Sequence, residues 1–182
     1  YKEIMAPNSP DSPVTSNVAS ASVCGLFSLL LSVAVAIFGA ASVHANSVPL
    51  YSFNGGVGAN PYASLVQGSD GNFYGTTLHG GTKGFGSVFK ITPGGSLVTL
   101  HNFTGSDGAS PYASLVQGSD GNFYGTTSQG GASDAGTAFK ITPGGSLTTL
   151  YSFSYSDGAN PYTSLVQGSD GNFYGTTSQG GA

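Results

Sequence analysis

The chain is built on a tandem repeat with a period of fifty residues. The block SLVQGSDGNFYGTT at residues 64–77 returns unchanged at residues 114–127 and again at residues 164–177. A second block, FKITPGGSL at residues 89–97, returns at residues 139–147. A fixed period of this length is typical of stacked copies of one supersecondary unit. Residues at the same phase of every copy most simply serve the fold, whereas a catalytic centre needs one asymmetric set of side chains.

Each copy is predicted to form four short strands separated by turn residues. In the first copy the predicted strands cover residues 63–67, 72–77, 86–92 and 96–103. In the turns, Asp can bond to its own backbone, Pro fixes φ, and Gly accepts a left-handed conformation. The predicted turn residues are Asp70, Gly71, Pro93, Gly94, Asp120, Gly121, Pro143, Gly144, Asp170 and Gly171.

Four antiparallel strands in a period near fifty are typical of a β-propeller blade. Neighbours such as Phe73 and Tyr74 point to opposite faces of a strand, so both faces of each sheet carry apolar bulk. We therefore predict an all-β chain, a partial β-propeller of four-stranded antiparallel blades, with about two and a half blades over residues 46–182. A right-handed β-helix is the alternative. Exposed sheet edges and blade faces are expected to promote self-association.

An apolar leader precedes the repeats. Residues 1–22 are polar and are predicted to be disordered, whereas residues 23–41 carry no charge and approach the length of a membrane-spanning helix. The sequence Val43-His44-Ala45 fits the small-x-small pattern that signal peptidase accepts. We predict a leader helix and signal peptide over residues 23–45, with an uncleaved signal anchor as the alternative. Either would place the repeats outside the membrane, secreted or on the cell surface.

The charge and cysteine content exclude several classes of site. The chain has four Lys and Arg residues and a net charge of −4, so no basic patch is available to neutralise phosphates and nucleic-acid binding is not expected. Its one cysteine, Cys24, provides neither a disulfide nor a thiolate metal site. The Asp70 turn has too few oxygen ligands for Ca²⁺. No triad, phosphate loop or dinucleotide motif is present, so no catalytic residue, metal or cofactor is predicted.

The crossover loop of each copy supplies the candidate ligand-binding residues. Tyr62, Tyr112 and Tyr162 each follow a proline there, and aromatic faces suit the apolar side of a sugar ring. We predict that these tyrosines bind a ligand together with Asn60 and Asn160; packing between blades is the alternative. Loops that differ between copies are further candidates, because binding residues concentrate in loops on a rigid scaffold. These loops cover residues 54–57, 78–85, 128–135 and 154–157.

Three blocks of the repeat resemble the GloVer-type tandem repeats. They are GSDGNFYGTT at residues 68–77, VFKITPGG at residues 88–95 and LYSF at residues 50–53, and the resemblance covers residues 47–182. Such repeats occur in bacterial secreted proteins that attach to the surface through sorting anchors, so the resemblance implies a location and a modular use.

The blocks are also distantly similar to virginiamycin B lyase-like propellers. That family's implied activity is metal-assisted cleavage of a cyclic depsipeptide by His and Glu side chains. The repeats here contain no Glu, and His79 and His101 differ in phase, so no catalytic residue is carried over.

The function predicted from the sequence is that of a secreted or surface-displayed module that binds an extracellular glycan or protein. Membrane contact is expected only through the leader or a further anchor. The alternative is part of a propeller enzyme, a lyase or glycan hydrolase, whose catalytic residues lie outside this sequence.

Overall fold

A computed structural model describes residues 3–6 and 48–181. The predicted leader helix and cleavage site, over residues 23–45, lie outside these residues. Every regular element in the described part of the chain is a strand, and no helix there is long and apolar enough to cross a membrane. The chain is therefore all-β over the part that the structure describes, as predicted.

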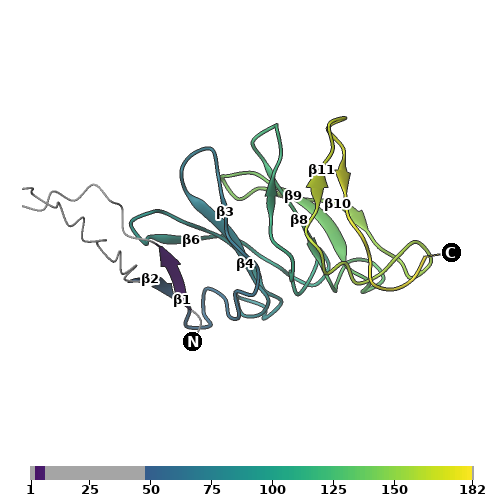
Figure 1. The fold of residues 1–182 in the computed structure, drawn as a ribbon. Helices are drawn as coiled ribbons and strands as arrows, with labels where there is room; N and C mark the ends of the chain where they lie inside the picture. Colours follow the sequence, from purple (N-terminus) through teal and green to yellow (C-terminus); the bar gives the residue numbers. More distant parts are fainter. Residues whose placement is uncertain (1–2, 7–47, 182) are drawn as a thin grey trace, which may run out of the picture. The chain divides into compact units, whose positions relative to one another are not determined.

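The first repeat folds into a four-stranded antiparallel sheet whose strands follow the order of the sequence (Figure 1). The strands are β3 (Val66–Gln67), β4 (Phe73–Thr77), β5 (Ser87–Ile91) and β6 (Leu97–Asn102). The second repeat forms the same sheet with β7 (Val116–Gln117), β8 (Phe123–Thr127), β9 (Thr137–Ile141) and β10 (Leu147–Ser152). The predicted four-stranded antiparallel units are confirmed.

Two smaller sheets complete the description. The third repeat contributes β11 (Val166–Gln167) and β12 (Phe173–Tyr174), which pair antiparallel. Near the start of the chain, β1 (Glu3–Ala6) pairs with β2 (Val48–Ser52). The strand β1 falls inside the segment predicted to be disordered, where sequence periodicity gave no sign of a strand. The described residues contain no closed propeller ring.

The first strand of each repeat is shorter than predicted. In the first copy the strand covers Val66–Gln67, and residues 63–65 precede it outside the regular sheet. The side chain of Leu65 lies over Gly75 on β4, where an added Cβ would come within 2.7 Å of it. Leu115 covers Gly125 in the same way at 2.8 Å. The leucine therefore packs onto the face of the sheet at the position where β4 carries a glycine.

A phenylalanine from the third strand fills the core of each complete sheet. Phe89 is fully buried and meets Phe53 edge to face, with ring centroids 5.1 Å apart. Phe139, also fully buried, meets Phe103 with centroids 5.3 Å apart. Edge-to-face pairs of this kind add to the free energy gained by burying the rings.

Successive repeats are joined by aromatic stacking. The fully buried ring of Tyr74 stacks on Phe123 of the next repeat, with centroids 3.9 Å apart. Tyr124 stacks on Phe173 at the same distance. The sheets therefore pack through side chains that belong to the invariant block, and each junction uses the same pair of positions.

Candidate functional site

The crossover loops carrying the predicted tyrosines are fixed to their own repeats by backbone hydrogen bonds. The N–H of Ala59 donates to the carbonyl of His79 at 2.7 Å, and the N–H of His79 donates back at 3.1 Å. The same pair of bonds joins Ala109 to Gln129. The loop is therefore a rigid continuation of the sheet and holds the following Pro-Tyr in place.

A left-handed residue precedes the proline in every copy. Asn60, Ser110 and Asn160 have φ values of 59°, 54° and 53°. Asparagine tolerates this region because its short polar side chain bonds locally. The Asn160 side chain donates a hydrogen bond to the carbonyl of Ser128 in the preceding repeat, at 2.8 Å. Asn160 is thus engaged in the scaffold, whereas Asn60 is exposed.

The three tyrosines form one continuous row across the three repeats. Tyr62 and Tyr112 lie with ring centroids 5.5 Å apart and ring planes 14° from parallel. Tyr112 and Tyr162 have the same separation, with planes at 89°. The rings are 49%, 42% and 46% exposed, although each contacts its neighbour. We call Tyr62, Tyr112 and Tyr162 the tyrosine row.

A shallow hollow of about 220 Å³ lies against the tyrosine row. Its lining comes from three repeats and consists of Leu78, His79, Ser110, Tyr112, Ser128, Gln129 and Tyr162. The Ser110 hydroxyl donates to the side-chain oxygen of Gln129 at 3.2 Å, which orients that amide. None of the lining residues is a carboxylate or a lysine. The hollow therefore offers aromatic rings, hydroxyls and an amide, which suit a neutral ligand rich in hydroxyl groups.

The described residues form no cluster of the side chains that most often bind metal ions. No group of three or more His, Cys, Asp or Glu side chains comes together in that part of the chain. Its one His–carboxylate contact joins His101 Nε2 to Asp107 at 2.8 Å. In the next repeat Tyr151 takes the place of the histidine and bonds Asp157. Tyrosine has no basic nitrogen, yet it makes the equivalent contact with the aspartate. We therefore infer that the contact stabilises the loop and does not depend on the imidazole.

The predicted Asp turns form a small hydrogen-bonded cluster. The carboxylate of Asp70 accepts bonds from the Asn72 backbone at 3.1 Å, the Asn72 amide at 2.8 Å and the Tyr74 hydroxyl at 2.7 Å. The Tyr74 hydroxyl is the largest of the influences that hold the pKa of Asp70 below its usual value. Burial and the nearby Asp70 carboxylate raise the pKa of Tyr74. Gly71 takes a φ of 79° and closes the turn on Gly68.

The same turn geometry recurs in the later copies. Asp120 and Asp170 accept equivalent bonds, and Gly121 and Gly171 have φ values of 79° and 82°. In the other turn the left-handed residue is the second glycine after the proline. Gly95 has a φ of 84° and Gly145 a φ of 97°, whereas Gly94 and Gly144 are not left-handed.

The sequence comparison identifies the repeat. A family model described as the Gloeobacter/Verrucomicrobia repeat matches residues 34–182. The chain belongs to this family. The resemblance to GloVer-type repeats is thereby confirmed over all three copies. A comparison with curated proteins finds no match. Membership of this family supports a repeat module and assigns it no function.

Proposed function

We propose that this GloVer chain is a secreted or surface-displayed binding module that recognises a neutral extracellular glycan along the tyrosine row. The observation that carries the proposal is the row itself. Tyr62, Tyr112 and Tyr162 occur at one phase of the repeat and remain between 42% and 49% exposed, so burial in the core does not account for them.

The geometry of the row favours a chain-like ligand. Contacts between neighbouring tyrosines limit their conformational freedom, so a ligand that binds them loses little side-chain entropy. Stacking between Tyr62 and Tyr112 covers one face of each ring. The surface that a ligand can contact therefore consists of the opposite ring faces, the ring edges and the hydroxyls. A linear glycan crossing the row would contact several tyrosines at once. The Gln129 amide, which lines the hollow beside the row, would form hydrogen bonds to the hydroxyls of such a glycan.

The absence of charge around the row supports a neutral ligand. The hollow beside Tyr112 is lined by uncharged side chains apart from the ionisable His79. Sulfated or phosphorylated polymers would find no lysine or arginine there, and the chain as a whole is acidic. Binding is therefore expected to depend weakly on salt, because few counterions would be released.

The decisive experiment compares glycan binding by the unaltered protein and three variants. A panel of neutral polysaccharides is screened by affinity electrophoresis, and the ligand found is titrated by calorimetry. Tyr112→Ala should weaken binding by roughly tenfold, because the central ring contacts both neighbours. Tyr112→Phe keeps the ring and isolates the contribution of the hydroxyl. Tyr155→Ala is the matched control: Tyr155 is 57% exposed and lies outside the row. Equal binding by the Tyr112→Ala and Tyr155→Ala proteins would overturn the proposal.

We further propose that the sheets are successive blades of a β-propeller. Support comes from the repeated face-to-face packing of Tyr74 on Phe123 and of Tyr124 on Phe173, since propeller blades pack sheet against sheet. Small-angle scattering of a protein containing several more repeats would separate the two architectures. A closed ring should have a smaller radius of gyration than an extended solenoid with the same number of repeats.

The secretion step can be tested separately. Expression of the chain in a bacterial host and N-terminal sequencing of the exported product should place the first residue at Asn46. A product that keeps residues 1–45 and stays in the membrane fraction would indicate the signal-anchor alternative.

A further inference from the structure

The tyrosine row brings phenol rings of successive repeats into contact with one another. Tyr62 and Tyr112 lie with ring centroids 5.5 Å apart and ring planes 14° from parallel, so the two phenols face each other. Tyr112 and Tyr162 are equally close, but their planes stand at 89°. Two phenols in contact are the starting arrangement for oxidative coupling, because each ring supplies one carbon of the new bond.

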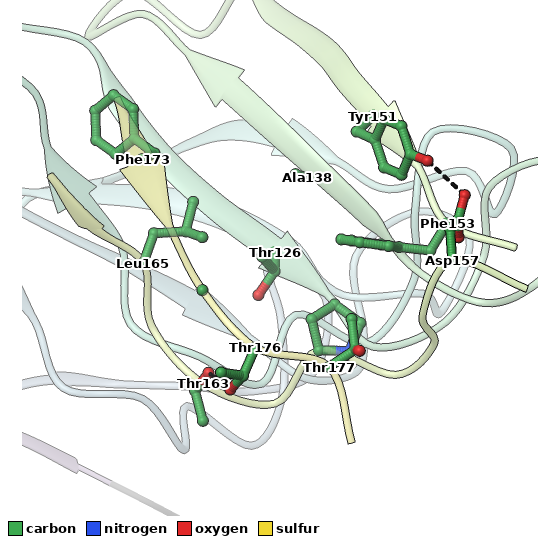
Figure 2. Close-up of a pocket in the computed structure, with 12 residues that line it drawn as sticks. Thr126, Ala138, Tyr151, Phe153, Asp157, Thr163, Leu165, Phe173, Thr176 and Thr177 are labelled. Carbon is green, nitrogen blue, oxygen red and sulfur yellow. Dashed lines mark hydrogen bonds between the residues drawn. The ribbon is translucent and has the colours of Figure 1, made fainter. Parts of the chain in front are cut away.

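Every other ring contact that a tyrosine makes in the described part of the chain is with a phenylalanine. Figure 2 shows one of these contacts: the Tyr151 hydroxyl is directed at the Asp157 carboxylate, and the ring of Phe153 lies next to Tyr151. Phenylalanine has no phenolic hydrogen to lose, so these contacts cannot form the same link. The pairs are Tyr51 with Phe53, Tyr74 with Phe123, Tyr124 with Phe173, and Tyr151 with Phe153.

The stacked pair is also open to an oxidant in solution. Tyr62 and Tyr112 are 49% and 42% exposed, whereas Tyr74 on β4 is fully buried. Because neither exposed ring is enclosed by the protein, both can turn about their side-chain bonds. Small rotations of this kind would bring the carbons beside the two hydroxyls into bonding distance. Access to the oxidant and freedom to react therefore coincide at this pair.

The backbone keeps the two rings next to each other. Hydrogen bonds at Ala59 and Ala109 fix the two crossover loops to their own repeats. The repeats are joined in turn by the stacking of Tyr74 on Phe123. A radical on one ring of the pair therefore has its partner already in contact, whereas coupling between two molecules depends on their concentration. The structure thus favours a link within one chain.

We propose that Tyr62 and Tyr112 form a site of oxidative cross-linking, at which a haem peroxidase and hydrogen peroxide convert the stacked pair into dityrosine. Each phenol loses one hydrogen atom, that is, one electron and one proton. The two phenoxyl radicals then join through the ring carbons ortho to their oxygens, and the hydrogens on these carbons move to the oxygens to restore both phenols. One molecule of hydrogen peroxide takes up the two electrons and two protons and leaves as two molecules of water.

The cross-link would tie together the crossover loops of successive repeats. Tyr62 and Tyr112 are one period of fifty residues apart, so the new bond closes a long loop in the unfolded chain and lowers its conformational entropy. The cross-linked protein should therefore have a higher Tm than the untreated protein. The pair of Tyr112 and Tyr162 should couple less, because its perpendicular rings must first turn toward one another.

The test treats the full chain with a haem peroxidase and hydrogen peroxide and measures dityrosine fluorescence and intact mass. A product of monomer size that has lost two hydrogens is expected, and its yield per chain should not change when the protein is diluted. Trypsin then locates the bond, because cleavage after Lys83, Lys90 and Lys140 places Tyr62, Tyr112 and Tyr162 in three different peptides. The main linked product should join residues 3–83 to residues 91–140.

Two variants decide whether the stacked pair is the site. Tyr62→Phe keeps the ring but has no phenol, so the link between these two peptides should be lost. Tyr155→Phe is the matched control, since Tyr155 is 57% exposed and lies outside the row, and its yield should equal that of the unaltered protein. Circular dichroism before oxidation checks that both variants are folded.

Three results would overturn the proposal: no dityrosine, dityrosine formed only between chains with a yield that rises with protein concentration, or a link between the two peptides that survives in Tyr62→Phe. The assay contains no glycan, so its outcome is independent of the proposed binding function.

Discussion

The side-chain oxygen of Gln117 accepts a hydrogen bond from the backbone N–H of Ser69, 48 residues earlier in the chain, at 2.9 Å. The amide nitrogen of the same glutamine donates to the Ser69 hydroxyl at 3.2 Å and to the carbonyl of Gly121 in its own turn at 3.1 Å. Gln167 bonds Ser119 in the same way at the next junction. One glutamine thus links the turns of two neighbouring repeats.

Loss of this link should weaken the whole array. Gln117→Ala removes three hydrogen bonds and should lower the free energy of unfolding by about 1 kcal/mol, because the site is only half-buried. Urea unfolding followed by circular dichroism measures the change. Gln67→Ala is the matched control, since Gln67 bonds only its own turn among the described residues, at 3.4 Å. Equal losses in the two variants would show that the junction contact contributes nothing.

Acid should destabilise the protein through the Asp turns. The pKa values of Asp70, Asp120 and Asp170 are held below the ordinary value by bonds from neighbouring tyrosine and asparagine side chains. A carboxylate whose pKa is lower in the folded state stabilises the fold above about pH 4, and that contribution disappears as the pH falls through the folded-state value. Thermal melts between pH 7 and pH 2 should therefore show a fall in Tm that begins below about pH 4.

The Asp70→Asn variant tests the assignment of this acid sensitivity. It should show a shallower fall in Tm, because one of the titrating carboxylates has been removed. If the dependence of Tm on pH were identical to that of the unaltered protein, the Asp70 carboxylate would not contribute to the acid sensitivity.

The glycine at the repeat position of Gly75, Gly125 and Gly175 should tolerate a methyl group only where no phenylalanine ring lies on it. Gly125→Ala forces a Cβ to within 2.8 Å of both Leu115 and Phe139, and overpacking of this kind costs about 1 to 3 kcal/mol. Gly175→Ala meets a leucine at 2.7 Å but no ring, so its cost should be smaller. Comparison of the two free energies of unfolding isolates the contribution of the phenyl contact. A larger loss of unfolding free energy in Gly175→Ala than in Gly125→Ala would contradict this prediction.

The Thr126 hydroxyl offers a stabilising substitution. It is buried and has no hydrogen-bond partner among the described residues, whereas the equivalent Thr76 hydroxyl donates to the carbonyl of Ala113 at 3.5 Å. Thr126→Val removes an unsatisfied group and should raise the free energy of unfolding by about 1 kcal/mol. Thr76→Val, the control, should gain less, because it gives up a hydrogen bond. Calorimetric Tm values would show the difference, and a loss of stability in Thr126→Val would indicate a bound water.

The strand pattern could be predicted from the repeat because turn residues mark its boundaries. Asp70-Gly71 and Pro93-Gly94 lie between strands whose order and antiparallel pairing follow from short connections. The predicted first strand was too long: it included residues 63–65, whereas β3 covers Val66–Gln67.

The site was less predictable, because it depends on side chains from different copies. The positions of Tyr62, Tyr112 and Tyr162 within the repeat showed that these residues are equivalent. Nothing in the sequence indicated that their rings lie in contact. Asn160 was predicted to bind a ligand, and that role stays a prediction; its side chain bonds Ser128 of another repeat, a contact with no signature in the local sequence. The role of Gln117 could not be predicted, because nothing in the local sequence indicates that a glutamine on a two-residue strand bonds Ser69 of another repeat.

The bridge from Gln117 to Ser69 also determines which changes in length the protein tolerates. Every partner in the junction belongs to the invariant block, so insertion or deletion of one whole period leaves each remaining glutamine facing the same serine. A change of any other length separates the partners. Unequal recombination between the near-identical copies would therefore generate longer and shorter proteins that all fold through the same contacts, and copy number is the property that such a gene can vary with the least structural penalty.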